Sequence, residues 1–160
     1  MKTNTITTAK KLTEGFILRP PTMDDVEATV AMVNACSIDL IGKPETQEHE
    51  FRNDWSSPTL STEKDLRVIE ASSGDIVGYC GVWDVEPHVR VFSWAHVHPR
   101  HKGRGLETAL IDWLEARAER AMRQAPEGTR VSLLHGAKSV DDDKQALLEQ
   151  HDYALVRHWF

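Results

Sequence analysis

The sequence predicts an α/β fold built on a mixed, mostly antiparallel sheet that about four helices flank. Three runs rich in β-branched and aromatic residues follow one another between residues 66 and 97, separated only by short turns, as in an antiparallel meander. A strand–helix–strand passage over residues 89–134 comes next, and a crossover of this kind joins parallel strands. The length of 160 residues suits one domain.

The amino-terminal third is expected to hold one strand and two helices. Residues 1–13 are polar and lack the apolar core of a signal peptide, so we expect a flexible segment ahead of a single domain over residues 14–160. Phe16–Arg19 predicts a short strand. A helix capped by Thr22 follows, with apolar residues at helical spacing, and residues 45–53 predict a second, short and polar helix.

The rest of the chain predicts further strands and two more helices. The strands are expected at Leu66–Ala71, Ile76–Asp84, Val89–Val97 and Thr129–Leu134. Apolar side chains recur at helical spacing from Leu106 to about Ala121, which predicts a long helix. The run Asp141-Asp142-Asp143 is typical of the acidic first turn of a helix, here ending near Gln150.

Tyr153–Phe160 predicts a last strand, which ends in two large aromatic residues. Such a strand leaves unpaired backbone groups and apolar side chains at the edge of the sheet. We therefore expect a second copy of the chain, as a homodimer, or a fused second domain to cover it. The alternative is that Trp159 and Phe160 fold back onto the core of the domain.

Composition narrows the classes of partner. The net charge of −6 argues against a general nucleic-acid binder, and positive charge gathers only between Arg90 and Arg104. No apolar run approaches the length of a membrane span, so no membrane partner is expected. The two cysteines, Cys36 and Cys80, lie far apart, which favours a reduced, cytoplasmic protein.

The segment 97–110, VHPRHKGRGLETAL, carries the clearest functional signal. A strand enters it, a helix leaves it, and the turn between them holds two glycines and several basic residues. Glycine lets the backbone approach a ligand closely, and the first N–H groups of a helix are unpaired donors with partial positive charge. The combination indicates a phosphate-binding turn.

This turn and the order of elements resemble the GNAT superfamily of acetyl-CoA-dependent N-acetyltransferases, over nearly all of residues 14–160. The resemblance implies that the N–H groups of a [Q/R]-x-x-G-x-[G/A] turn cradle the pyrophosphate of coenzyme A. It also implies that strand 89–97 splays from its parallel neighbour to admit the pantetheine arm. Family members usually have one more strand after the equivalent of 153–160, and we expect that strand to be missing here.

Two alignments of the turn compete. Arg100-x-x-Gly103-x-Gly105 matches the pattern literally, whereas aligning the Val97-x-Pro99 step puts Glu107 in the last small-residue place. We prefer the second, because it preserves both the strand end and the helix start. The residues expected to bind acetyl-CoA are His96, Val97, His98, Lys102, Gly103, Arg104, Gly105, Leu106, Glu107 and Thr108.

Glu107 leaves two interpretations open. A carboxylate facing the pyrophosphate would repel it by about 4 kcal/mol at 4 Å and an effective dielectric of 20. A carboxylate at a helix N-terminus is otherwise favourable by about 0.3–1 kcal/mol. The chain also departs from the family at Leu148, where a tyrosine often protonates the thiolate, at Asp141 in place of asparagine, and at Asp152 in place of glycine.

Acetyl transfer to an amine needs a base, directly or through water. The candidates on or beside the central strands are His96, His98, Glu86 and Asp84. The alternative is that His96 and His98 only form hydrogen bonds at the end of a sheet. No metal site is expected, because His88, His96, His98 and His101 do not follow the spacing of zinc ligands.

The resemblance implies an N-acetyltransferase that moves an acetyl group from acetyl-CoA to a primary amine of a small molecule or peptide. Glu107, Leu148 and Asp152 favour an alternative, a non-catalytic GNAT-like domain with a ligand-sensing or structural role. Such a domain could be half of a tandem protein.

Overall fold

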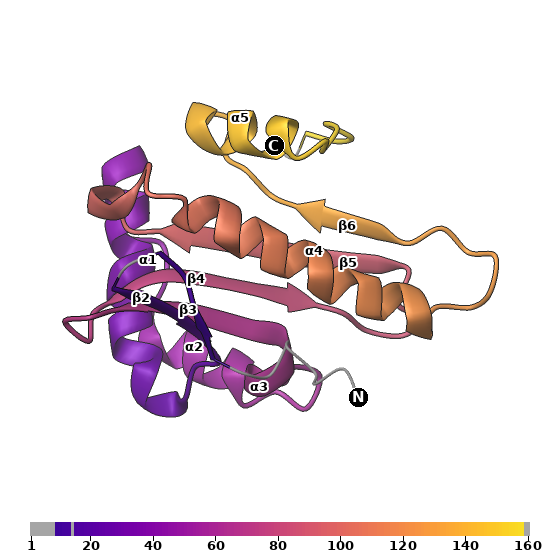
Figure 1. Ribbon diagram of the computed structural model, residues 1–160, viewed down its shortest axis with the longest axis horizontal. Helices are drawn as coiled ribbons and strands as arrows, with labels where there is room; N and C mark the ends of the chain where they lie inside the picture. The colour runs from indigo at the N-terminus through magenta and orange to yellow at the C-terminus, as the bar shows by residue number, and fades with distance from the viewer. Residues whose placement is uncertain (1–8, 14, 159–160) are drawn as a thin grey trace.

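The computed structural model describes residues 9–13 and 15–158, and within them the predicted mixed α/β fold is confirmed (Figure 1). Its sheet contains β1 (Lys10–Lys11), β2 (Phe16–Arg19), β3 (Leu66–Ala71), β4 (Ile76–Trp83), β5 (Arg90–Val97) and β6 (Ser132–His135), in that spatial order. The helices are α1 (Val26–Ile41), α2 (Glu48–Trp55), α3 (Thr62–Asp65), α4 (Leu106–Gln124) and α5 (Asp142–Gln150), with 3₁₀ turns η1 (Met23–Asp25) and η2 (Pro99–His101). Neighbouring strands are antiparallel except β5 and β6, which are parallel, as the crossover predicts.

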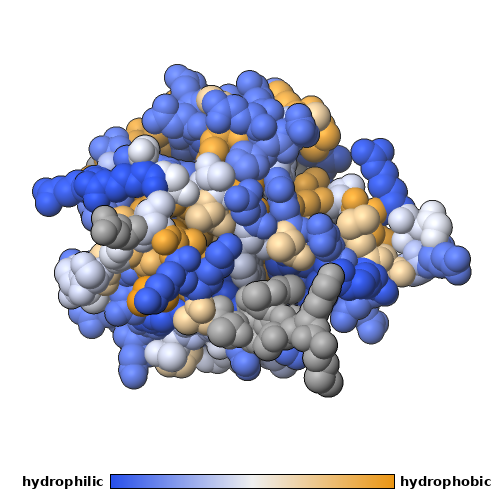
Figure 2. All heavy atoms as spheres, in the orientation of Figure 1, coloured by the Kyte–Doolittle hydropathy of each residue, from blue (hydrophilic) through white to orange (hydrophobic). Residues whose placement is uncertain are grey.

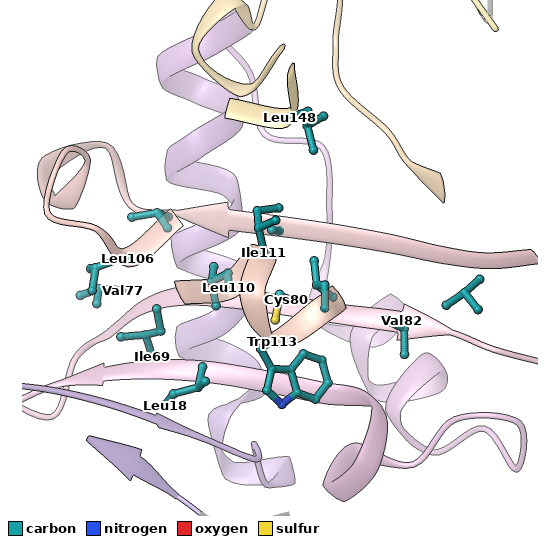
Figure 3. Packing of buried hydrophobic residues seen from close by; sticks show 14 of the residues in the cluster. Leu18, Ile69, Val77, Cys80, Val82, Leu106, Leu110, Ile111, Trp113 and Leu148 are labelled. Atoms are coloured by element: carbon teal, nitrogen blue, oxygen red, sulfur yellow. The ribbon is translucent and has the colours of Figure 1, made fainter. Parts of the chain in front are cut away.

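The helices cover both faces of the sheet, with α4 on one side and α1 on the other (Figure 1). The helical spacing of α4 places Leu110, Ile111 and Leu114 in the core against β4 and β5. Figure 3 shows Leu110 and Ile111 there. The opposite face buries a second cluster, in which Val26 and Val30 of α1 pack with strand residues. The face seen in Figure 2 is mostly hydrophilic, with small hydrophobic patches.

The pairing of β5 with β6 stops early. It runs from Arg90 opposite Ser132 to Ser93 opposite His135, although β5 continues to Val97. The Ser132 amide donates to the Val89 carbonyl. Every second residue from there on, 91, 93, 95 and 97, therefore also directs its backbone N–H and C=O groups toward the β6 side. Ala95 and Val97 therefore turn their peptide groups toward an opening between the two strands.

Three elements differ in detail from expectation. Helix α2 runs over Glu48–Trp55 instead of the expected residues 45–53, and Trp55 is buried. The short helix α3 was not expected; the Ser61 side chain caps it by accepting from the Lys64 amide. Of residues 1–13, expected to be flexible, Lys10–Lys11 pair with β2 as β1, and residues 1–8 lie outside the described part.

The predicted strand Tyr153–Phe160 is wrong over the described residues 153–158. Residues 153–158 form no strand, and the side chains of Leu155 and Val156 are 76% and 78% exposed. A run of high β propensity becomes a strand only where another strand pairs with it, and no described strand does so here. Trp159 and Phe160 lie outside the described residues, so the expected aromatic edge cannot be placed there. Among the described helices, none has the length and apolar character needed to cross a membrane.

Candidate functional site

A cleft of about 900 Å³ opens where β5 and β6 part. Its walls come from α1, the end of β5, the turn before α4, α4 itself and the segment from β6 through α5. Of the residues expected to bind the cofactor, His96, Val97, Lys102, Gly103, Gly105, Glu107 and Thr108 line it. The other three do not: Leu106 is buried in the core, and His98 and Arg104 lie outside the lining.

The turn before α4 depends on its glycines. Gly103 and Gly105 have φ of 76° and 78°, a region that side chains rarely adopt, and Gly105 is the N-cap residue of α4. No atom would lie within 4 Å of a Cβ at either position, so the space beside the backbone is open. The turn therefore presents its peptide groups to the cleft.

Glu107 already uses one of these donors. Its Oε1 atom accepts a hydrogen bond from the Gly103 amide at 3.3 Å, and its half-buried side chain lines the cleft. The carboxylate therefore combines features of both interpretations: it lies at the start of α4, and it contacts the turn that would cradle a diphosphate. A bound anion would meet a negative charge there.

Two backbone carbonyls at the opening are also engaged. The Lys144 ammonium, from the first turn of α5, donates to the Ala95 carbonyl at 2.8 Å. The Cys36 thiol, from α1, donates to the Val97 carbonyl at 3.2 Å. Burial lowers the pKa of Lys144 and raises that of the Cys36 thiol to about 11. Lys144 therefore holds its side-chain nitrogen inside the cleft against the Ala95 carbonyl, while Cys36 stays a thiol at pH 7.

Two histidines line the same opening, His96 on β5 and His135 at the end of β6. Burial is the main cause that lowers their pKa values, to about 3 for His96 and about 4 for His135. The Ser93 hydroxyl donates to the Leu134 carbonyl, so the contact of 2.8 Å between Ser93 Oγ and His135 Nδ1 makes Nδ1 the donor. His135 Nε2 therefore carries a lone pair, and this buried atom has no hydrogen-bond partner.

The other candidate bases lie elsewhere. The Nδ1 atom of His98 accepts from the Arg100 amide, which makes His98 the cap of η2. Glu86 is exposed in the turn before β5, at the end of the strand away from the opening. The buried Asp84 carboxylate contacts Arg117 at 3.2 Å and His88 at 2.8 Å. These contacts give Asp84 and His98 structural roles.

The departures from the family pattern have different physical meanings. Leu148 is buried in the core, so it leaves the cleft without an acid at that place (Figure 3). Asp141 caps α5 by accepting from the Lys144 amide at 3.0 Å. Asp152 has a φ of 63°, so its backbone keeps the left-handed conformation that favours glycine.

The sequence analysis missed His135 and Lys144. Ligands in sheets with parallel strands bind outside the carboxyl ends of those strands, where neighbouring strands part. Val97 and His135 end the one parallel pair of the described sheet, and the next helix begins with Lys144 in its first turn. That rule, applied to the predicted 89–134 passage, would have indicated both residues.

Comparison with known proteins agrees with this geometry. Residues 31–153 match the acetyltransferase (GNAT) family, and the chain belongs to this family. A GCN5-related N-acetyltransferase from Sphaerobacter thermophilus has a TM-score of 0.82 and 28% identity, over 88% of this chain and 44% of that one. The chain thus spans less than half the length of that relative.

Two further solved structures share the fold. YncA, a putative acetyltransferase from Salmonella typhimurium solved with its cofactor acetyl-CoA, has a TM-score of 0.69 and 19% identity, over 90% of this chain and 82% of that one. An N-acetyltransferase from Staphylococcus aureus Mu50 has a TM-score of 0.64 and 17% identity, over 87% and 83%. The search of curated proteins returned no match.

Proposed function

We propose that the chain is an N-acetyltransferase that transfers an acetyl group from acetyl-CoA to a primary amine of a small molecule or peptide. The observation that carries this proposal is the opening between β5 and β6, bordered by the glycine turn at the start of α4. The turn offers backbone donors for a pyrophosphate, and the N–H groups of Ala95 and Val97 face the opening, where a pantetheine arm can pair with them.

The residues present fit acetyl-CoA in shape and in most of their chemistry. The cleft of about 900 Å³ is of the size that cofactor sites have. Lys102 adds a positive charge to the lining near the turn, and Glu107 opposes it. When bound, acetyl-CoA would supply the acetyl group as a reactive thioester.

The cleft residues then have distinct tasks. His96 and His135 are neutral at pH 7, since their pKa values are about 3 and 4, so they can accept a hydrogen bond from the amine and pass its proton to water. The Lys144 ammonium can stabilise a departing thiolate. Because both imidazoles are weak bases, activity is expected to rise toward alkaline pH, where more of the amine is neutral.

One observation favours a second candidate function, a non-catalytic GNAT-like domain. The Glu107 carboxylate already accepts from the Gly103 amide in the proposed pyrophosphate site. In addition, the chain spans 44% of its Sphaerobacter relative, as half of a tandem protein would. Such a domain would sense a ligand or support a catalytic half.

Calorimetric titration with acetyl-CoA tests the proposal. We expect saturable binding that Gly105→Asp abolishes, because the substitution puts a carboxylate beside the turn donors. Gly42→Asp is the matched control: Gly42 has the same φ of 78° and open surroundings, ends α1 and lies outside the cleft lining. Binding without release of coenzyme A thiol across an amine panel would favour the non-catalytic domain, and no binding would contradict the cofactor site.

A further inference from the structure

A second cleft, of about 480 Å³, lies on the face of the sheet that α1 and α2 cover. It shares two lining residues with the first cleft, Val33 of α1 and His96 of β5. His96 is therefore a common wall, with the proposed thioester site on one side and the second cleft on the other.

Aromatic rings form the walls of this second cleft. Tyr79 is the centre of the cluster: its ring centroid lies 5.5 Å from that of Phe51, 5.9 Å from Trp55 and 6.5 Å from Trp94. The Trp55 indole N–H donates to the Tyr79 hydroxyl at 3.3 Å, which fixes both rings. The cleft is thus a preformed aromatic surface.

Gly81 makes room for one of these walls. It pairs with Trp94 across β4 and β5, and a Cβ at Gly81 would lie 2.5 Å from Trp94 Cζ2. The indole of Trp94 therefore lies against the bare backbone of β4. A flat group is the natural occupant of a space bounded by such rings, which stack in offset or edge-to-face arrangements.

The charge of the cleft is negative. Asp54 is the one charged residue among its lining residues, since burial keeps His96 neutral at pH 7. Asp54 is exposed on α2, and no cation of the described residues pairs with its carboxylate. Aromatic faces attract cations within about 6 Å of the ring centre, so the rings and the carboxylate favour the same kind of ligand.

We propose that the second cleft binds the acceptor substrate as an organic ammonium ion with a flat apolar body, of the arylalkylamine class. This inference rests on the proposed acetyl transfer, because it takes the ligand of the second cleft to be the acceptor. The rings enclose the apolar body, Asp54 attracts the ammonium group from solvent, and the shared wall at His96 places the ligand beside the thioester site.

Titration with 2-phenylethylamine, in the absence of acetyl-CoA, tests the binding. We expect it to bind about tenfold more tightly than 2-phenylethanol, which has the same body without the charge. Asp54→Asn should weaken binding of the amine about three- to fivefold, without changing binding of the alcohol. Trp83→Ala, which removes a half-exposed ring at the rim of the cleft, should weaken the binding of both the amine and the alcohol.

Glu48→Gln is the matched control, because Glu48 lies on the same helix, outside the second cleft. Equal affinity for amine and alcohol, no binding of the amine at 10 mM (about 3 kcal/mol or less of binding free energy), or equal effects of Asp54→Asn and Glu48→Gln would overturn the inference. Titration with acetyl-CoA separates the two proposals. If acetyl-CoA binds and the amine does not, the proposed acetyl transfer stands and the arylalkylamine acceptor is excluded. If the amine binds and acetyl-CoA does not, the proposed acetyl transfer is contradicted.

Discussion

At the scale of single residues, the polar groups of the cleft between β5 and β6 form hydrogen bonds with one another. Glu107 accepts from the turn that would hold a pyrophosphate, and Lys144 donates to a carbonyl of the opening. An anion bound at the turn must therefore compete with an internal carboxylate. This competition lowers the affinity for the anion. It does not affect the stability of the fold, because Glu107 is only half-buried.

The first prediction concerns that competition. Glu107→Ala frees the Gly103 amide and removes a negative charge, so acetyl-CoA should bind at least tenfold more tightly, or about 1.4 kcal/mol. The gain should shrink as salt rises, because salt screens the repulsion. Glu119→Ala, on the exposed side of the same helix, is the control and should change the affinity less than twofold. A similar small change for Glu107→Ala would mean that the carboxylate turns toward water when the ligand binds.

The second prediction concerns Asp152. A non-glycine residue in the left-handed region costs about 1–2 kcal/mol, and its φ is 63°. Glycine avoids this cost. Its unfolded chain has more conformational entropy, however, and this offsets about 0.5–1 kcal/mol of the gain in stability. Asp152→Gly should therefore raise the free energy of unfolding by about 0.5–1 kcal/mol in urea titrations. Ala146→Gly, exposed in the middle of α5, should instead lower it by about 1 kcal/mol, and a loss at both positions would contradict the argument.

At the scale of elements, one buried cation ties α4 to two neighbours. Arg117 of α4 contacts the Asp65 carboxylate of α3 at 2.8 Å and that of Asp84, after β4, at 3.2 Å. The side chains of all three are nearly buried. This explains why Asp84, a candidate base from its place in the sequence, is held at the end of the sheet away from the opening.

The third prediction follows from this contact. Arg117→Ala removes the guanidinium that two buried carboxylates share, so the free energy of unfolding should fall by about 3–5 kcal/mol. Arg123→Ala, in the last turn of the same helix and exposed, is the control and should lie within about 0.5 kcal/mol of the unchanged protein. Chemical denaturation at pH 7 measures both variants.

At the scale of the whole molecule, the sequence predicts what depends on local pattern. Residues 66–97 form three runs rich in β-branched and aromatic residues that end at turns, so β3, β4 and β5 could be predicted nearly to the residue. The helical spacing of α4 and the glycine turn before it were equally readable. The family resemblance is confirmed by the match over residues 31–153.

What could not be predicted depends on contacts between distant segments. Residues 153–158 have strand propensity, but no local pattern shows whether another strand is available to pair with them. The Lys144 ammonium meets the Ala95 carbonyl across 49 residues, and Tyr79 gathers rings from α2 and β5. The contacts inside both clefts are products of packing, so only the structure shows which of these side chains meet.

The last prediction concerns the stability of the whole domain as a function of pH. His96 and His135 have native pKa values of about 3 and 4, below the 6.5 of an unfolded histidine. As the pH falls below 6.5, each binds a proton in the unfolded chain but not in the native one, so stability falls. Each contributes up to about 1.4 kcal/mol per pH unit between pH 6 and the native pKa.

Replacing either histidine by glutamine removes that contribution while keeping a polar side chain of similar size. The free energy of unfolding of His96→Gln should therefore fall less steeply between pH 6.5 and 4.5 than that of the unchanged protein, and so should that of His135→Gln. His49→Gln, exposed on α2, is the control and should leave the slope unchanged. Urea titrations across this range measure the slopes, and identical slopes for all variants would show that the two cleft histidines take up protons in the native state. They would then be stronger bases than their burial implies.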